Sequence, residues 1–162
     1  MFETHYANMN PDSKLNAYTE IHTKWSGLQD PQSPWYSDLS NASALLYHVL
    51  KPWWVGFYLI EGDNLHLGPF QGPTACTRIP KGKGVCGTAW LKRESIVVPN
   101  VHEFPGHIAC SDQSNSEIVI PLISFGEIWG VLDIDSVHYN AFDALDVIEL
   151  EKFCASLNPH KL

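Results

Sequence analysis

Three cysteines in the middle of the chain are the residues best suited to chemistry. Cys86 follows Lys-Gly-Lys-Gly in the first turn of a predicted helix, where backbone N–H groups, the helix dipole and nearby lysines would stabilise a thiolate. Cys110 lies in a long polar loop after His107, whose imidazole would lower the pKa of the thiol. Cys76 ends the segment GPFQGPTA and is the least distinctive. The pattern predicts a thiol redox relay, with buried space-filling thiols as the alternative.

The fourth cysteine and the spacing of all four favour neither structural disulfides nor zinc. Cys154 lies on the apolar stripe of the last predicted helix and is expected to be a small buried side chain. Reducing conditions inside a cell would keep structural disulfides open. Zinc sites favour cysteine pairs roughly two to four residues apart, a spacing that this sequence lacks, and His102 and His107 offer only a loose alternative. We therefore expect no metal and no bound cofactor.

Three acidic residues are predicted to gather on one face of a sheet. Asp133 and Asp135 are separated by one residue in a predicted strand, so both side chains project from the same face. Glu117 opens the preceding strand of the same hairpin and is expected to lie close to them. Such carboxylates can bind a cation, hold an ammonium group or share a proton with a raised pKa. The alternative is that they cap strand ends or pair with lysines.

Two aromatic residues share one face of another predicted strand. Trp54 and Tyr58 are four residues apart, a spacing that places both rings on the same side. The simpler interpretation is that they are core residues. An aromatic wall facing carboxylates would instead suit a ligand with an apolar sulfur end and a cationic end.

The elements that must position these residues form a predicted α+β domain. Apolar spacings predict a first helix around Leu15, Tyr18, Ile21 and Trp25, and further helices over residues 37–50, 85–94 and 142–157. Strands are predicted over residues 53–62, 65–70, 75–80, 95–101, 117–124 and 127–137. Strands joined mostly by hairpins imply an antiparallel sheet, and the helices at both ends must bury their apolar stripes against one face. One domain over residues 1–162 is expected.

Charge and hydropathy argue against several classes of partner. The 162 residues carry a formal net charge of −8, and the ten basic residues are scattered, which opposes binding to nucleic acid or to an anionic membrane. No apolar run is long enough to cross a bilayer, and the N-terminus does not resemble a secretory signal. We expect a cytoplasmic protein, with the nucleus as an alternative, and leave a homodimer open.

Four segments together resemble a known enzyme family. They are WVGFYLIEGDNLHLGPFQGPTAC, IPKGKGVCGTA, VPNVHEFPGHIACSDQSNSEIVIPL and GVLDIDS. In this order and at this spacing they resemble the free methionine-R-sulfoxide reductases, which are single GAF-domain enzymes. The resemblance runs from about Ser40 to Phe153, whereas residues 1–35 match only loosely and are expected to form an N-terminal extension with a helix.

The resemblance implies a fold, a substrate and a set of site residues. The implied fold is a GAF-like, six-stranded antiparallel sheet with helices packed on one face. The implied activity is reduction of the R-sulfoxide of free methionine, with no cofactor other than an external reductant, thioredoxin. Catalytic cysteines are expected at Cys110, Cys86 and Cys76, and substrate-binding residues at Glu117, Asp133, Asp135, Trp54 and Tyr58.

The order in which the thiols act stays open at this point. A thiolate would attack the sulfoxide, become a sulfenic acid and condense with a second thiol to a disulfide that thioredoxin reduces. We expect Cys110 to attack and Cys86 to resolve, with Cys76 as an alternative partner, and the reversed order as a rival. The alternative function is a GAF module that senses a small molecule or redox state without turnover.

Overall fold

The computed structural model describes residues 9–108 and 112–157. Within them, six strands form an antiparallel sheet in the order β3-β2-β1-β6-β5-β4, which confirms the predicted α+β fold. The helices are α1 (Pro11–Leu28), α2 (Trp35–Leu50), α3 (Gly84–Lys92) and α4 (Ala144–Ala155). The strands are β1 (Trp54–Glu61), β2 (Asn64–Gln71), β3 (Arg78–Pro80), β4 (Ile96–Val98), β5 (Ser116–Ser124) and β6 (Glu127–Ser136).

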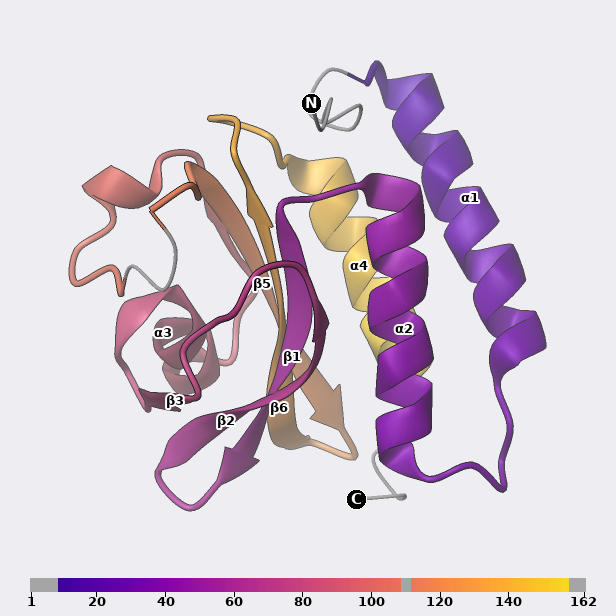
Figure 1. The fold of residues 1–162 in the computed structure, drawn as a ribbon, viewed down its shortest axis with the longest axis horizontal. Coiled ribbons are helices and arrows are strands. Elements are labelled where there is room, and N and C mark those ends of the chain that lie inside the picture. Colours follow the sequence, from indigo (N-terminus) through magenta and orange to yellow (C-terminus); the bar gives the residue numbers. More distant parts are fainter. Residues whose placement is uncertain (1–8, 109–111, 158–162) are drawn as a thin grey trace.

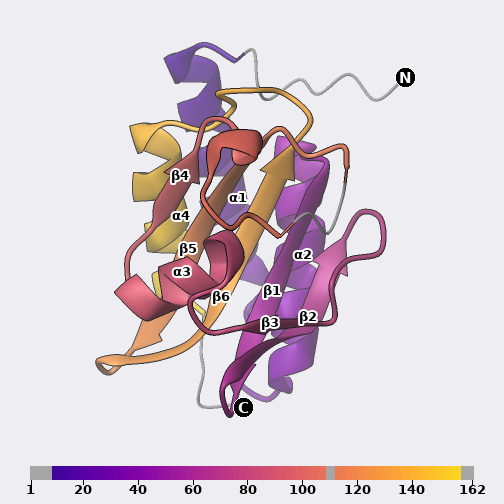
Figure 2. The same cartoon turned by 90° about the vertical axis from the view of Figure 1, so that its left-hand side faces the viewer.

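The two faces of the sheet carry different layers. Helices α2 and α4 pack on one face, and α1 lies outside them (Figure 1). The short α3 lies on the opposite face, together with loops that connect the strands (Figure 2). The predicted packing of helices on one face therefore holds for the three long helices, whereas α3 covers the other face. In the described part of the chain, no helix has the length and hydropathy needed to span a membrane.

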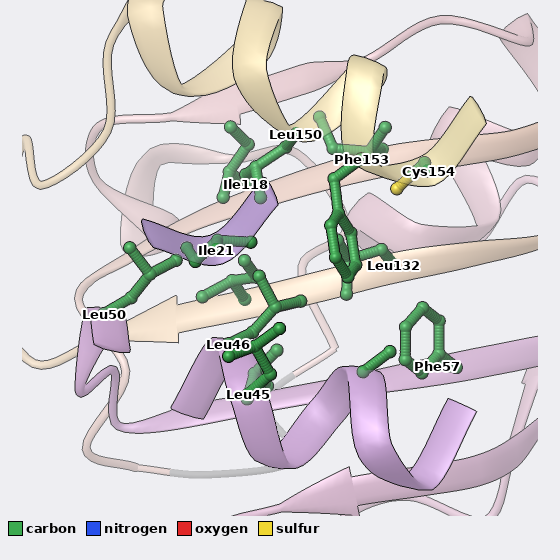
Figure 3. Close-up of a cluster of buried hydrophobic side chains, with 14 of the residues drawn as sticks. Ile21, Leu45, Leu46, Leu50, Phe57, Ile118, Leu132, Leu150, Phe153 and Cys154 are labelled. Atoms are coloured by element: carbon green, nitrogen blue, oxygen red, sulfur yellow. The ribbon is translucent and has the colours of Figure 1, made fainter. Parts of the chain in front are cut away.

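The alternation of side chains along each strand separates a structural core from the site. Phe57 of β1 and Leu132 of β6 point into the core under the long helices, where they meet Phe153 (Figure 3). Trp54 and Tyr58 of the same β1 strand belong to the cluster on the opposite face. Because successive side chains of a strand point to opposite faces, each central strand serves both layers.

Some element ends differ from the sequence prediction. The second helix begins at Trp35, earlier than the predicted start, and the strand predicted over residues 75–80 is limited to Arg78–Pro80. Strand β4 ends at Val98, because Pro99 has no N–H to continue the ladder. Leu15 was expected on the buried stripe of the first helix but is 48% exposed, since the buried face of α1 begins one residue earlier in the sequence.

A buried lysine fastens the N-terminal helix to the last helix. Lys14 is only 5% exposed, and its Nζ donates hydrogen bonds to Asp146 Oδ2 at 2.7 Å, to Asp143 Oδ2 at 2.9 Å and to the Ala141 carbonyl at 3.3 Å. The Tyr18 hydroxyl donates to the other oxygen of Asp146 at 2.8 Å. These bonds hold helix α1 of the predicted N-terminal extension against the start of α4.

Replacing Lys14 with methionine is expected to lower the free energy of unfolding by about 3–5 kcal/mol, because the buried Asp146 carboxylate would lose this cation. Chemical denaturation measures the effect. Lys24→Met is the matched control, since Lys24 pairs with Glu20 at 2.6 Å on the exposed side of the same helix and should change stability little. Equal losses in both variants would contradict the anchoring role of Lys14.

Candidate active site

A cavity opens on the sheet face opposite the long helices. Its empty volume is about 570 Å³, including the part open to solvent. Its walls come from β1, β5, β6 and α3, from residues 73–75 after β2, and from the loop that contains His107 and Ser114. Of the predicted site residues that the structure describes, six line it: Trp54, Tyr58, Cys86, Glu117, Asp133 and Asp135. The structure thus brings the predicted carboxyl and aromatic groups together with one of the predicted thiols.

The three carboxyl groups lie on neighbouring strands. Glu117 of β5 pairs in register with Asp135 of β6. Asp133 lies two residues before Asp135 in β6, so its side chain projects from the same face. Glu117 and Asp133 are only 5% and 7% exposed. Burial is the main cause that raises the pKa of all three groups well above its usual range, and repulsion from a neighbouring carboxyl adds to it. A raised pKa was one of the properties considered for these carboxyls from the sequence, and desolvation is its larger cause here.

One oxygen in this group has no hydrogen-bond partner within residues 9–108 and 112–157. Asp133 Oδ1 is buried and accepts no hydrogen bond from the described residues. No lysine or arginine is among the described residues that line the cavity. A buried carboxylate oxygen without a partner is costly, so the geometry favours a ligand that brings its own donor or positive charge.

Two polar loop residues contact the carboxyl groups, a role that the sequence pattern does not predict for them. His107 Nε2 lies 3.7 Å from Glu117 Oε2, and burial lowers the pKa of His107, which favours a neutral imidazole. Ser114 hydrogen-bonds to Asp135 and partly offsets the rise in its pKa. The sequence indicates only that both residues lie in a polar loop. Which strand residues such a loop contacts cannot be predicted from sequence spacing.

The aromatic pair forms a fixed wall of the cavity. The rings of Trp54 and Tyr58 stack with centroids 5.9 Å apart and an angle of 28°. Trp54 Nε1 donates to the Pro73 carbonyl at 3.1 Å, and the Tyr58 hydroxyl donates to the Cys76 carbonyl at 2.9 Å. Both polar ends are thereby satisfied by the backbone, and the Phe70 ring stacks on Trp54 with centroids 5.5 Å apart, so the wall is apolar and held in place.

Cys86 has an environment unlike the one predicted from its place at a helix start. It is 3% exposed, and its Sγ lies 4.0 Å from Glu117 Oε1. Burial raises the pKa of the Cys86 thiol well above its usual value, and the neighbouring carboxyls, Asp133 first, raise it further. Of the two nearby lysines, Lys81 lies over the Trp90 ring, 4.8 Å from its centroid. The expected stabilisation of a Cys86 thiolate is therefore wrong.

The remaining cysteines differ in state. Cys76 is disulfide-bonded, whereas Cys86 and Cys154 are free thiols. Cys154 is buried in the core under the long helices, as predicted. Cys110, the predicted attacking thiol, lies outside the described residues, and its role stays a prediction.

Comparison with known proteins identifies the family. The model of the GAF domain matches residues 43–157. The free methionine-R-sulfoxide reductase of Saccharomyces cerevisiae is 43% identical, covering 95% of this chain and 92% of its own. The chain belongs to the free methionine-R-sulfoxide reductase family. Membership in this family of GAF-domain proteins makes it an oxidoreductase.

Further relatives agree with this family and with the fold. GAF domain-containing protein A of Dictyostelium discoideum is 50% identical over 83% of this chain and 85% of its own. The crystal structure of the free methionine-R-sulfoxide reductase from Neisseria meningitidis, in complex with its substrate, is 42% identical with a TM-score of 0.80. That alignment covers 95% of this chain and 92% of the Neisseria chain. The GAF fold predicted from the sequence is thus confirmed.

Proposed function

We propose that this protein reduces free L-methionine-R-sulfoxide to L-methionine by cysteine thiol chemistry. The observation that carries the proposal is the buried carboxyl cluster, in which Asp133 Oδ1 has no hydrogen-bond partner among the described residues, beside the stacked Trp54 and Tyr58 rings on the neighbouring strand. Relatives at 43% and 42% identity are free methionine-R-sulfoxide reductases, which supports the same substrate for this chain.

The carboxyl cluster supports recognition of a free amino acid. An α-ammonium group supplies the donors and the positive charge that Glu117, Asp133 and Asp135 lack among the described lining residues. Methionine within a peptide has an amide at this position and therefore has no such charge. The S-methyl end would lie against the aromatic wall, since sulfur contacts with ring faces and edges are favourable.

The proposed reaction has two steps, oxygen transfer to a cysteine and then formation of a disulfide. The Cys110 thiolate attacks the sulfoxide sulfur, the S–O bond breaks, and the oxygen passes to the cysteine as a sulfenic acid while methionine leaves. The substrate sulfur gains two electrons and the cysteine sulfur loses two. A carboxylic acid of the cluster with a raised pKa donates a proton to the oxygen, and a second thiol condenses with the sulfenic acid and releases water.

Cys76 is the better candidate for the second thiol. It is disulfide-bonded, whereas Cys86 is a free thiol with a raised pKa beside two carboxyls. A thiol that resists ionisation is a poor nucleophile and a poor resolving group. We therefore place Cys76, which was first expected as the alternative, ahead of Cys86, and we expect thioredoxin to reduce the disulfide by exchange.

The test is methionine formation by fully reduced protein supplied with thioredoxin or dithiothreitol. Turnover is expected with free L-methionine-R-sulfoxide and only at background level with the S epimer. Cys154→Ala should keep the rate, because Cys154 lies on the other side of the sheet. A background rate with the R epimer would contradict the proposal and favour a GAF module that binds a small molecule without turnover.

A further inference from the structure

We propose that the cavity also binds a thiophilic divalent cation of the Zn²⁺ class through Cys86, Glu117 and Asp133, in competition with the amino acid. The competition rests on the proposed function, whereas cation binding itself does not. Such a cation would act as a reversible inhibitor and not as a resident cofactor.

The geometry of the three side chains carries the inference. Cys86 Sγ and one carboxylate oxygen each of Glu117 and Asp133 lie within 4.8 Å of one another, and all three residues are buried. They come from α3, β5 and β6, so their backbones are held by the helix and the sheet. Tetrahedral zinc with bonds of roughly 2.0–2.3 Å needs ligand atoms about 3.3–3.8 Å apart. Side-chain rotations that move these ligand atoms by about an ångström would therefore bring them to the distances that the ion needs.

A second observation points to a ligand at this place. Asp133 Oδ1 is buried and has no hydrogen-bond partner among the described residues, although Asp133 is only 7% exposed. A bound cation would satisfy this oxygen and would offset the mutual repulsion of the buried carboxyls.

The donor set selects the class of cation. One sulfur with two carboxylate oxygens suits borderline-soft ions such as Zn²⁺, whereas Mg²⁺ and Ca²⁺ prefer oxygen ligands alone. Three protein ligands leave a fourth position open, as in zinc sites that exchange their fourth ligand and unlike closed structural sites. His107 Nε2, 3.7 Å from Glu117 Oε2, is placed to hydrogen-bond to that ligand and to orient it.

The separation of the ligands along the chain explains why spacing does not reveal this site. Cys86, Glu117 and Asp133 belong to three different elements, and the paired spacing of zinc motifs arises only when neighbouring ligands share one loop or helix. The expectation of no metal rested on that spacing alone.

The experiment uses the oxidised protein, in which Cys76 is disulfide-bonded and, among the described residues, Cys86 and Cys154 are free thiols. Titration with Zn²⁺ in a calorimeter is expected to give one ion per chain. Co²⁺ should give a thiolate-to-metal charge-transfer band. Cys86→Ser should remove the band and weaken Zn²⁺ binding by about 100-fold or more, since even losing a supporting residue costs about 10- to 100-fold. Cys154→Ala should change neither.

The outcomes separate cation binding from the proposed function. Absence of binding to the wild-type protein, or unchanged affinity and band in Cys86→Ser, would overturn the cation site. Asp133→Asn guards against misfolding of Cys86→Ser, because it leaves the thiol in place and should still weaken binding. Zn²⁺ should also weaken binding of free methionine-R-sulfoxide, and independent binding of the two would overturn the competition. Zn²⁺ binding without any sulfoxide binding would refute the proposed function alone.

Discussion

Cys110→Ser is expected to form no methionine, even when enzyme and substrate are mixed in equal amounts. The reason is that the attacking sulfur is lost, and a serine hydroxyl cannot accept the sulfoxide oxygen in a two-electron step. Methionine is quantified by chromatography after a single mixing of fully reduced protein with free methionine-R-sulfoxide. A full equivalent of methionine from Cys110→Ser would show that another thiol attacks.

Cys76→Ser tests the resolving role in the same assay. This variant should release one methionine per chain and then stall in the presence of thioredoxin, because the sulfenic acid has lost the proposed resolving thiol. Cys86→Ser is the matched comparison, since Cys86 is a free thiol, and it should continue to turn over at a reduced rate. A stall in Cys86→Ser with turnover in Cys76→Ser would restore the order first expected from the sequence.

Asp133→Asn is expected to lower kcat/KM for the free amino acid by about 30- to 1,000-fold, the effect of removing one partner from a buried charge pair. N-acetylmethionine-R-sulfoxide has no α-ammonium group and should be a poor substrate for the wild-type protein. Asp133→Asn should therefore lower kcat/KM for this substrate much less. The difference between the two losses measures the interaction between the Asp133 carboxylate and the ammonium group. Equal losses on both substrates would show that Asp133 does not recognise the ammonium group.

The stability of Asp133→Asn separates a functional role from a structural one. Burial raises the pKa of Asp133, so its ionised form opposes folding at any pH above the pKa of the unfolded state. Removal of this carboxylate should therefore leave the Tm of the ligand-free protein unchanged or raise it. Asp63→Asn, at an exposed position in the turn between β1 and β2, is the control for both activity and Tm. A large fall in Tm for Asp133→Asn would mean that lost activity reflects lost folding.

The sequence was sufficient where a rule of local geometry decides the outcome. Alternation along a strand placed Trp54 and Tyr58 on one face and Asp133 and Asp135 on one face, and the structure brings both pairs into one cavity. Helix periodicity likewise predicted that Cys154 is buried. These features depend on a few neighbouring residues, so they can be read without knowledge of the tertiary packing.

The sequence was insufficient where distant elements meet. The start of α3 suggested a stabilised thiolate at Cys86, but the carboxyls of β5 and β6 reverse the electrostatic effect. The contacts of His107 with Glu117 and of Ser114 with Asp135 depend on how a polar loop folds over the sheet. Strongly coupled buried groups have properties of the assembled cluster, which no single segment contains.

The hydrogen bonds from the aromatic wall to the chain after β2 have a further consequence. Trp54 Nε1 and the Tyr58 hydroxyl donate to the backbone carbonyls of Pro73 and Cys76, so neither hydrogen bond involves the Cys76 sulfur. Opening the disulfide at Cys76 breaks neither of them. In the proposed reaction, residues 73–76 are therefore expected to keep their place beside the aromatic wall while Cys76 changes between disulfide and thiol.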